Sequence, residues 1–444
     1  MNPVLATLAA ALGLATSTHA ADTVAGIVPC GPIARRHEAI ELSAIRLRRL
    51  GGTPIDRLGL MAYRDGTAQP IPFQVDERKP GSGGLAMEGG REPTTDDRPG
   101  VLDPDDLLVF MACDAGERAP GGTPPAAAGR EIRIDDPIAG ATGWAYVVVA
   151  DHPPRTDRRY VAYDPAQDRV VAHGYRVGMV QALPADFAIG FDRPLTPNLL
   201  DGLRLRAEAT LRPGLARWGI SERDGSHALV AWHAGPVRVV RRSRHKVGIG
   251  MGIELTAGLA HTFFYGEYVY GPGSMRLPIS LGTLFSSITA MGGVDMQVPE
   301  GWRYVAPGAP SPGFAIDGRM DDAERRFAGH GAWFTLVDDR QAILVAMTMS
   351  ENLKRTIPLS LTYVDDASRR APPEVTPGSV PLVGISGRDG QKLQAGRYGF
   401  QLHIVGLPDY RPGEERRALQ QLARRLTADV TMPADLAVAP APAR

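Results

Sequence analysis

Side chains that could transfer protons are concentrated in one stretch of this chain, residues 227–278. Four of the chain's ten histidines lie between His227 and His261, and arginine, tyrosine and glutamate accompany them. Tyrosine, glutamate and histidine that converge on a concave surface can act as general acids and bases, and arginine can neutralise a developing negative charge. The candidate catalytic residues in this stretch are Arg238, Arg242, His261, Tyr265 and Glu267.

The same stretch holds aromatic and imidazole groups suited to substrate binding. If residues 263–270 form strands, alternation predicts that Tyr265 and Glu267 share one face. Rings and guanidinium groups on that face could hold a sugar or a carboxylate by stacking and bidentate hydrogen bonds. A plainer alternative stays open, because aromatic residues are favoured in strands and exposed arginine and histidine often cover a sheet. The candidate binding residues are Trp232, His233, Tyr268 and Tyr270.

Two sequence elements resemble a known group of carbohydrate-active proteins. AGPVRVVRR (234–242) is followed by a T-x-F-Y-x-E pattern at Thr262–Glu267, and GxxLxAGxYxFxLxI runs from Gly390 to Ile404. Together they resemble proteins with the galactose-mutarotase-like β-supersandwich, which include epimerases, polysaccharide lyases and domains of glycoside hydrolases. The resemblance covers roughly residues 160–410. It implies that the concave face of a large sandwich binds a saccharide.

The resemblance implies a lyase- or epimerase-like activity, with Arg238, His261, Tyr265 and Glu267 as the candidate residues. A side chain would remove a proton next to a carboxylate or carbonyl while arginine stabilises the resulting charge. The alternative function is a non-catalytic envelope protein that acts as a binding or accessory subunit of a membrane-associated complex. Geometry separates the two hypotheses, because an enzyme needs these side chains to converge within hydrogen-bond reach in one pocket. The sequence leaves open whether the protein is an enzyme.

Acidic residues in the first part of the chain raise the question of a metal. Five carboxylates that could surround Ca²⁺ are Asp76, Glu77, Asp103, Asp105 and Asp106. The EF-hand pattern and its glycine are absent, however, and aspartate and proline before a strand are ordinary turn residues. Zinc-ligand spacing, the GxxxxGK[ST] phosphate loop and the GxSxG elbow are also absent. We therefore predict no metal and no cofactor.

The first twenty residues have the features of a secretory signal peptide. An apolar core from Val4 to Ala15 precedes Thr18 and Ala20, which stand at the −3 and −1 positions for cleavage before Ala21. No later segment is predicted to cross a membrane, so we expect a periplasmic protein. In an oxidising compartment, the two cysteines, Cys30 and Cys113, predict a disulfide, although two free thiols remain the alternative.

Overall composition is that of a globular protein. The 444 residues carry 49 basic and 49 acidic side chains and are 43% hydrophobic. A nucleic-acid-binding protein usually has a basic domain, so we predict no nucleic-acid partner. A glycan ligand or an envelope protein partner remains possible.

Glycine and proline interrupt the chain every 8–15 residues, and short alternating apolar runs lie between them, as is typical of antiparallel β-structure. We predict a mostly β protein: an N-terminal β-sandwich followed by a larger antiparallel, supersandwich-like β domain and a C-terminal helix. Leu419, Leu422 and Leu426 give that helix one apolar stripe. The predicted segments are a signal peptide at 1–20, the first domain at 22–152 with a long loop at 79–104, the second domain at 158–410, a docking helix at 412–428 and a disordered tail at 434–444.

Overall fold

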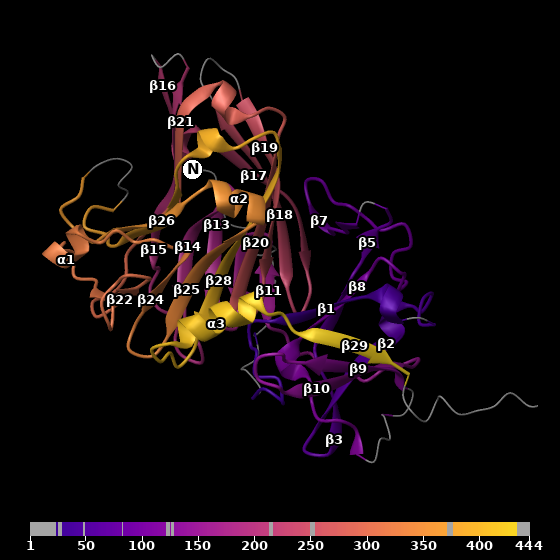
Figure 1. Ribbon diagram of the computed structural model, residues 1–444. Helices are drawn as coiled ribbons and strands as arrows, with labels where there is room; N and C mark the ends of the chain where they lie inside the picture. The colour runs from indigo at the N-terminus through magenta and orange to yellow at the C-terminus, as the bar shows by residue number, and fades with distance from the viewer. Residues whose placement is uncertain are drawn as a thin grey trace, which may run out of the picture.

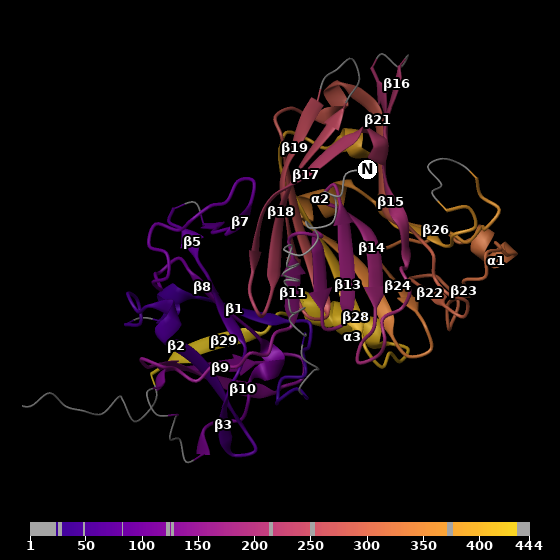
Figure 2. The same ribbon diagram turned by 180° about the vertical axis from the view of Figure 1, so that it is seen from behind.

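The computed structural model describes residues 24, 29–47, 49–81, 83–120, 125, 128–212, 216–248, 254–370 and 376–432. The predicted signal peptide and the predicted C-terminal tail lie outside the described residues. The prediction of a mostly β protein is confirmed, because antiparallel strands make up nearly all of the regular structure. Figures 1 and 2 show two β-rich units side by side, a smaller one drawn in indigo and purple and a larger one drawn in magenta and orange.

The N-terminal unit is built from two antiparallel sheets that enclose one apolar core. Alternation in the sequence explains the packing: Ile40 and Leu42 point into the core, whereas Glu41 between them points out. The three-stranded sheet has the order β1 (Ala39–Ser43), β8 (Leu107–Met111) and β4 (Phe73–Asp76). The five-stranded sheet has the order β29 (Thr427–Thr431), β9 (Ala128–Asp135), β10 (Thr142–Val149), β2 (Leu58–Arg64) and β3 (Thr67–Pro70).

The predicted disulfide is confirmed. Cys30 and Cys113 are bonded across a sequence separation of 83 residues. The bond ties the segment before β1 to the segment that follows β8, so it closes the N-terminal unit on itself.

The end of the chain returns to the N-terminal unit. Helix α3 spans Glu414–Ala423, which is shorter than the predicted 412–428, and Thr427–Thr431 form β29 beside β9. The threonine and valine residues of this segment suit an edge strand better than a last helical turn. The first unit therefore includes a strand that the predicted boundary of 22–152 leaves out (Figure 1).

A ten-stranded antiparallel sheet is the central element of the large unit. Its strands run continuously from the edge strand β23 to the short strand β7, which comes from the N-terminal unit. The order is β23 (Phe314–Ala315), β22 (Arg303–Val305), β24 (Trp333–Val337), β25 (Ala342–Met349), β28 (Gly396–Leu407), β20 (Tyr268–Leu277), β19 (Glu254–Phe264), β18 (Val239–Gly248), β17 (Gly225–Ala234) and β7 (Gly89–Gly90).

Two further sheets pack against one face of the ten-stranded sheet. The main core between them includes Val239, Phe264 and Ile343 from the large sheet. The four-stranded sheet contains β11 (Val161–Asp164), β12 (Arg169–Ala172), β13 (Tyr175–Val180) and β14 (Leu183–Ile189). The five-stranded sheet has the order β16 (Arg217–Ile220), β15 (Leu200–Leu211), β21 (Phe285–Met296), β27 (Leu382–Gly387) and β26 (Leu359–Val364).

The other face of the ten-stranded sheet carries the contact between the units. Val109 of β8, Ala418 of α3 and Val405 of β28 belong to one buried cluster. Leu419 and Leu422 pack against that cluster as the apolar stripe predicts, whereas Leu426 packs into the core of the N-terminal unit. Helix α3 thus lies across the edge where the two units meet (Figure 1).

The long loop predicted at 79–104 is partly structured. It contains the two-stranded pair β5 (Arg78–Lys79) and β6 (Gly84–Leu85), followed by β7. Through β7, this loop adds an edge strand to the ten-stranded sheet, with Gly89 opposite Trp232. Added side-chain atoms at Gly89 would collide with the Trp232 ring, so glycine permits the close approach.

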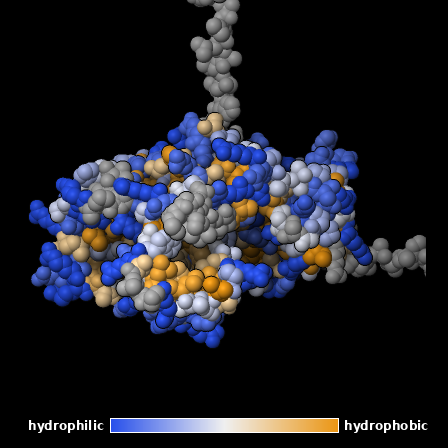
Figure 3. Space-filling view, turned by 90° about the horizontal axis from the view of Figure 1, so that it is seen from above, coloured by the Kyte–Doolittle hydropathy of each residue, from blue (hydrophilic) through white to orange (hydrophobic). Residues whose placement is uncertain are grey.

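Helices play a minor part in the fold. The remaining ones are α1 (Asp322–Arg325) and α2 (Glu351–Thr356). Within the described residues, none of the helices has the length and apolar character needed to cross a bilayer. At the end of the large unit seen from above, apolar side chains lie around a hollow (Figure 3). Exposed apolar residues of the large unit include Leu205 of β15 and Phe400 and Leu402 of β28.

Candidate binding site between the two units

A cleft of about 570 Å³ lies where the two units meet. Strand β1 forms one wall, the β19–β20 hairpin of the large unit forms another, and the segment between α3 and β29 forms the third. The lining residues are Glu38, Ala39, Ile40, Glu41, Leu42, Arg46, Tyr265, Tyr268, Tyr270, Arg425, Leu426, Thr427, Ala428 and Asp429. The volume falls in the range of small-molecule binding sites.

Three stacked tyrosines form the aromatic wall of the cleft. The Tyr265 and Tyr268 ring centroids are 5.6 Å apart, and those of Tyr268 and Tyr270 are 6.2 Å apart, with interplanar angles of 27° and 24°. The hairpin sets this order, because the Tyr265 amide donates to the Tyr268 carbonyl and strand alternation puts Tyr268 and Tyr270 on one face. Tyr265 and Tyr268 are only 3% and 4% exposed, so the half-buried Tyr270 is the ring of this row that a ligand can contact.

Charged groups of both signs stand opposite the tyrosines. The Glu41 side chain is 45% exposed, and its Oε1 accepts hydrogen bonds from Arg238 Nη1 (2.6 Å) and the Tyr265 hydroxyl (3.0 Å). Arg46 forms an exposed ion pair with Asp429, with Nη2 and Oδ1 3.3 Å apart. Arg425 is exposed at the same wall. A ligand in the cleft would meet both hydrogen-bond acceptors and donors.

Arg238 supports the cleft from behind but cannot contact a ligand. Its side chain is 2% exposed, and Nε donates to Asp76 Oδ2 (2.8 Å), as does Nη2. Burial alone would lower the pKa of Arg238, but the Asp76 charge raises it above its usual range. Burial would likewise raise the pKa of Asp76, yet Arg238 and His233 hold it well below its ordinary value. This ion pair joins the two units and fixes the Tyr265 hydroxyl.

His233 and Trp232 lie outside the cleft lining. His233 Nε2 lies 3.3 Å from Asp76 Oδ1, and Nδ1 lies 3.0 Å from Glu88 Oε2. Burial opposes protonation, but the two carboxylates raise the pKa of His233 to about 10. Trp232 packs edge-on against Tyr163, at a centroid distance of 5.2 Å. Both predicted binding residues therefore have structural partners.

Arg242 and His261 face each other across β18 and β19, away from the cleft lining. Arg242 Nη2 donates to the Glu92 carbonyl at 2.8 Å. Burial and the neighbouring Arg242 charge lower the pKa of His261. These two candidates do not meet Tyr265 in one pocket.

Tyr265 and Glu267 do not share a face, contrary to the alternation argument. Strand β19 ends at Phe264 and β20 begins at Tyr268, so the intervening residues form a turn in which period-two alternation does not apply. The Tyr265 hydroxyl points to Glu41 and Arg238, whereas Glu267 lies near Arg36, with Oε1 and Nη1 3.5 Å apart. Burial raises the pKa of Glu267 to about 7. The Glu267 side chain lines a separate small pocket beside Phe191, not the cleft.

The cleft has little capacity for proton transfer near neutral pH. The Tyr268 hydroxyl lies 2.7 Å from His403 Nδ1. Burial, helped by the Arg425 charge, lowers the pKa of His403 to about 4, and burial raises the pKa of Tyr268. The imidazole is then neutral and the phenol protonated, so this pair is suited to hydrogen bonding rather than to base catalysis.

Several cleft residues were missed by sequence reasoning. Glu41 lies 384 positions before Arg425, and no spacing rule connects them. The one local signal is that Glu41 occupies an outward position in an alternating strand. The cleft depends on β29 pairing with β9, and this pairing was not predicted.

Comparisons with known proteins give no family. No family model matches the chain, and no curated protein matches it. Among solved structures, the chain is similar to an alpha-mannosidase from Enterococcus faecalis V583, with 11% identity and a TM-score of 0.46 over 91% of this chain and 45% of that one. It is also similar to a glycosyl hydrolase family 38 protein from Enterococcus faecalis, with 10% identity and a TM-score of 0.44 over 91% and 46%. The chain spans less than half of each structure, and the galactose-mutarotase-like fold is not confirmed.

Proposed function

We propose that the cleft between the two units binds a saccharide. The observation that carries this proposal is the half-buried Tyr270, the end of a row of stacked tyrosines, in a cleft that Glu41 and Arg425 also line. Sugar rings present C–H faces that pack on aromatic rings, and their hydroxyl groups pair with carboxylates and guanidinium groups. A cleft with an aromatic surface and a few convergent polar groups meets both needs.

We propose binding rather than turnover as the primary function. The candidate catalytic side chains of a lyase or epimerase would need to converge, yet His261, Arg242 and Glu267 do not line the cleft. Arg238 is committed to Asp76, and the pKa of the Tyr265 phenol is raised by burial, despite the opposing Arg238 charge. Each of these facts favours a ligand held by hydrogen bonds.

We also propose that the protein works in the periplasm. The Cys30–Cys113 disulfide supports an oxidising compartment. The signal-peptide pattern of residues 1–20 supports secretion on sequence grounds. A saccharide of the cell envelope or of the medium would then be within reach.

The proposal is tested at Tyr270, the half-buried tyrosine of the row. Isothermal titration against neutral and uronate oligosaccharides should reveal at least one ligand. Tyr270→Ala should weaken its binding by about tenfold or more, since stacking on an aromatic ring contributes on the order of 1 kcal/mol beyond the area it buries. Tyr270→Phe keeps the ring and should bind within a few-fold of the unchanged protein.

Phe400→Ala is the matched control, because Phe400 is an exposed aromatic residue of β28 that does not line the cleft. It should leave saccharide affinity unchanged. If no saccharide in the panel binds, or if Phe400→Ala weakens binding as much as Tyr270→Ala, the proposed site is wrong. Formation of an unsaturated or epimerised product would overturn the assignment of a binding function alone.

A further inference from the structure

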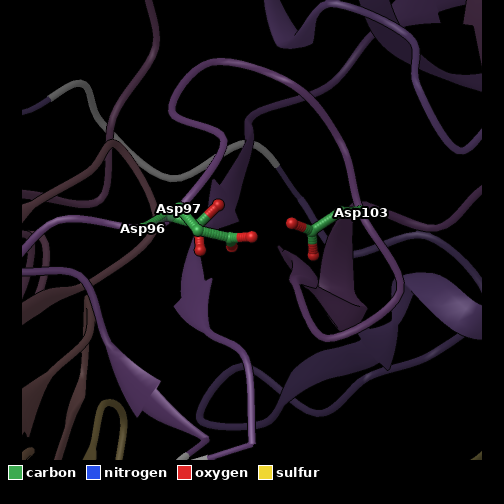
Figure 4. A group of neighbouring side chains, drawn as sticks. All are labelled: Asp96, Asp97 and Asp103. Atoms are coloured by element: carbon green, nitrogen blue, oxygen red, sulfur yellow. The ribbon is translucent and has the colours of Figure 1, made fainter.

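Three carboxylates converge in the loop that precedes β8. One carboxylate oxygen from each of Asp96, Asp97 and Asp103 lies within 4.8 Å of the other two. Figure 4 shows the three side chains pointing toward a shared space. Asp97 is exposed, whereas Asp96 and Asp103 are only 6% and 4% exposed.

The buried members of this cluster have no cationic partner. In the described part of the chain, neither Asp96 nor Asp103 forms a salt bridge with a basic side chain, and Oδ1 of Asp96 is buried without any hydrogen-bond donor. Buried carboxylates are normally paired with a cation or bound to a metal ion. A buried carboxylate oxygen without a donor, in a side chain grouped with two further carboxylates, is the arrangement that a metal ion would satisfy.

Backbone amides leave oxygen atoms of the cluster free to bind. The Arg98 amide donates to Asp96 Oδ2 at 3.3 Å, and the Asp105 amide donates to Asp103 Oδ1 at 3.3 Å. One oxygen of each buried carboxylate is therefore held in place, while the other has no backbone donor.

We propose that Asp96, Asp97 and Asp103 bind a calcium ion. Calcium takes six to eight oxygen ligands and accepts carboxylates, backbone carbonyls and water in flexible geometry. Magnesium fits less well, since it demands a near-ideal octahedron and releases its water reluctantly. Of the five carboxylates that the sequence suggested as calcium ligands, only Asp103 belongs to this cluster. Asp106, another of the five, accepts hydrogen bonds from the Asp103 and Arg78 amides.

The ion would brace the loop that joins the two units. Residues 79–106 run from β5 through β7 to the cluster. Within this loop, Glu88 contacts His233 and Glu92 pairs with Arg244 of the large unit. A calcium ion bound near the end of this loop would limit its motion and so keep Glu88 and Glu92 in contact with the large unit.

The experiment uses the full chain after treatment with a chelator. Calcium should raise the thermal unfolding temperature saturably, with a dissociation constant at or below about 10⁻³ M, as in extracellular calcium modules. Calcium should also slow proteolytic cleavage within residues 79–104. Matched ionic strength with sodium chloride should have neither effect. No calcium-dependent heat, temperature shift or protection up to about ten times that concentration would overturn the proposal.

Two variants test the ligands. Asp96→Asn and Asp103→Asn should weaken calcium binding at least about tenfold, whereas Asp339→Asn, an exposed aspartate of the large unit, should not. In chelator alone, both variants should be as stable as the unchanged protein or more stable, because they relieve repulsion between carboxylates. Lower stability in chelator with unchanged calcium affinity would show that the cluster is structural. Saccharide is absent throughout, so this result is independent of the proposed binding function.

Discussion

At the scale of single residues, the polar groups that stabilise the fold differ from the polar groups that a ligand can contact. Arg238, Asp76 and His233 have the right chemistry for a site, but they are largely buried and their polar atoms are engaged by protein partners. Glu41 and Arg425 are ordinary exposed residues, yet they face the aromatic wall. Accessibility therefore decides which residues are functional candidates, and residue type alone does not.

The histidine in this buried network makes stability depend on pH. His233 has a pKa of about 10 in the folded protein, compared with about 6.5 when unfolded. Its charged form is therefore favoured by folding, and the stabilisation is fully present below pH of about 6.5 and is lost as the pH rises toward 10. Unfolding midpoints measured between these values should fall more steeply for the unchanged protein than for His233→Gln, which cannot titrate.

His152→Gln provides the control for this measurement, because His152 is exposed in the segment that links the two units. Its pH profile should follow that of the unchanged protein. Identical slopes for His233→Gln and the unchanged protein would contradict a protonated histidine between Asp76 and Glu88.

At the scale of elements, the pairing of β29 with β9 builds the third wall of the cleft. Val430 is half-buried against the core of the N-terminal unit, whereas Thr431 at the end of the strand is exposed. The register of β29 thus fixes its residues 427–429 and, just before them, Arg425 and Leu426, and all five residues line the cleft. A remote C-terminal strand controls the geometry of a site formed mainly by other segments.

Disrupting this strand should affect stability and binding together. Val430→Asp places a charge against an apolar core and should cost about 2–3 kcal/mol of unfolding free energy. It should also weaken saccharide binding about tenfold, which corresponds to about 1.4 kcal/mol, because the wall is displaced. Chemical denaturation and titration calorimetry measure the two effects.

Thr431→Asp is the matched control, since it introduces the same charge one residue later at an exposed position. Because Thr431 pairs with Glu131 of β9, repulsion between the two carboxylates should cost up to about 1 kcal/mol, still less than the loss expected for Val430→Asp. If Val430→Asp lowers stability but leaves affinity unchanged, the α3–β29 segment is not part of the binding site.

Local patterns in the sequence predicted elements better than they predicted the site. Alternation correctly indicates the β class, and the leucines of α3 predict its docking. The same alternation fails at Tyr265–Glu267, where a turn replaces the strand, and at Thr427–Thr431, where tertiary pairing overrides the end of the helix. Tyr265, Tyr268 and Tyr270 were selected for their chemistry and do line the cleft. Glu41 and Arg425 could not be found, because only long-range pairing brings them together.

At the scale of the whole molecule, the two units are joined by contacts that cross the boundary repeatedly. Strand β7 extends the sheet of the large unit, and β29 returns the C-terminus to the small unit. The Gln74 Oε1 atom accepts the Val237 and Arg238 amides, beside the Arg238–Asp76 ion pair. Such shared structure should make the two units unfold as one, even though each has its own apolar core.

Arg238 provides the sharpest test of this coupling. Differential scanning calorimetry of the unchanged protein should give one transition, with equal calorimetric and van't Hoff enthalpies. Arg238→Met removes one partner of a buried ion pair and leaves the Asp76 charge uncompensated, which should cost about 3–5 kcal/mol and separate the transition into two. Arg244→Ala breaks an exposed pair with Glu92 and should cost less than about 1 kcal/mol while keeping one transition.

Because Arg238 also fixes Tyr265, the loss of Arg238 should weaken saccharide binding. Two transitions in the unchanged protein, or equal effects of the two arginine variants, would mean that the units fold independently and that the cleft is held by the α3–β29 segment alone.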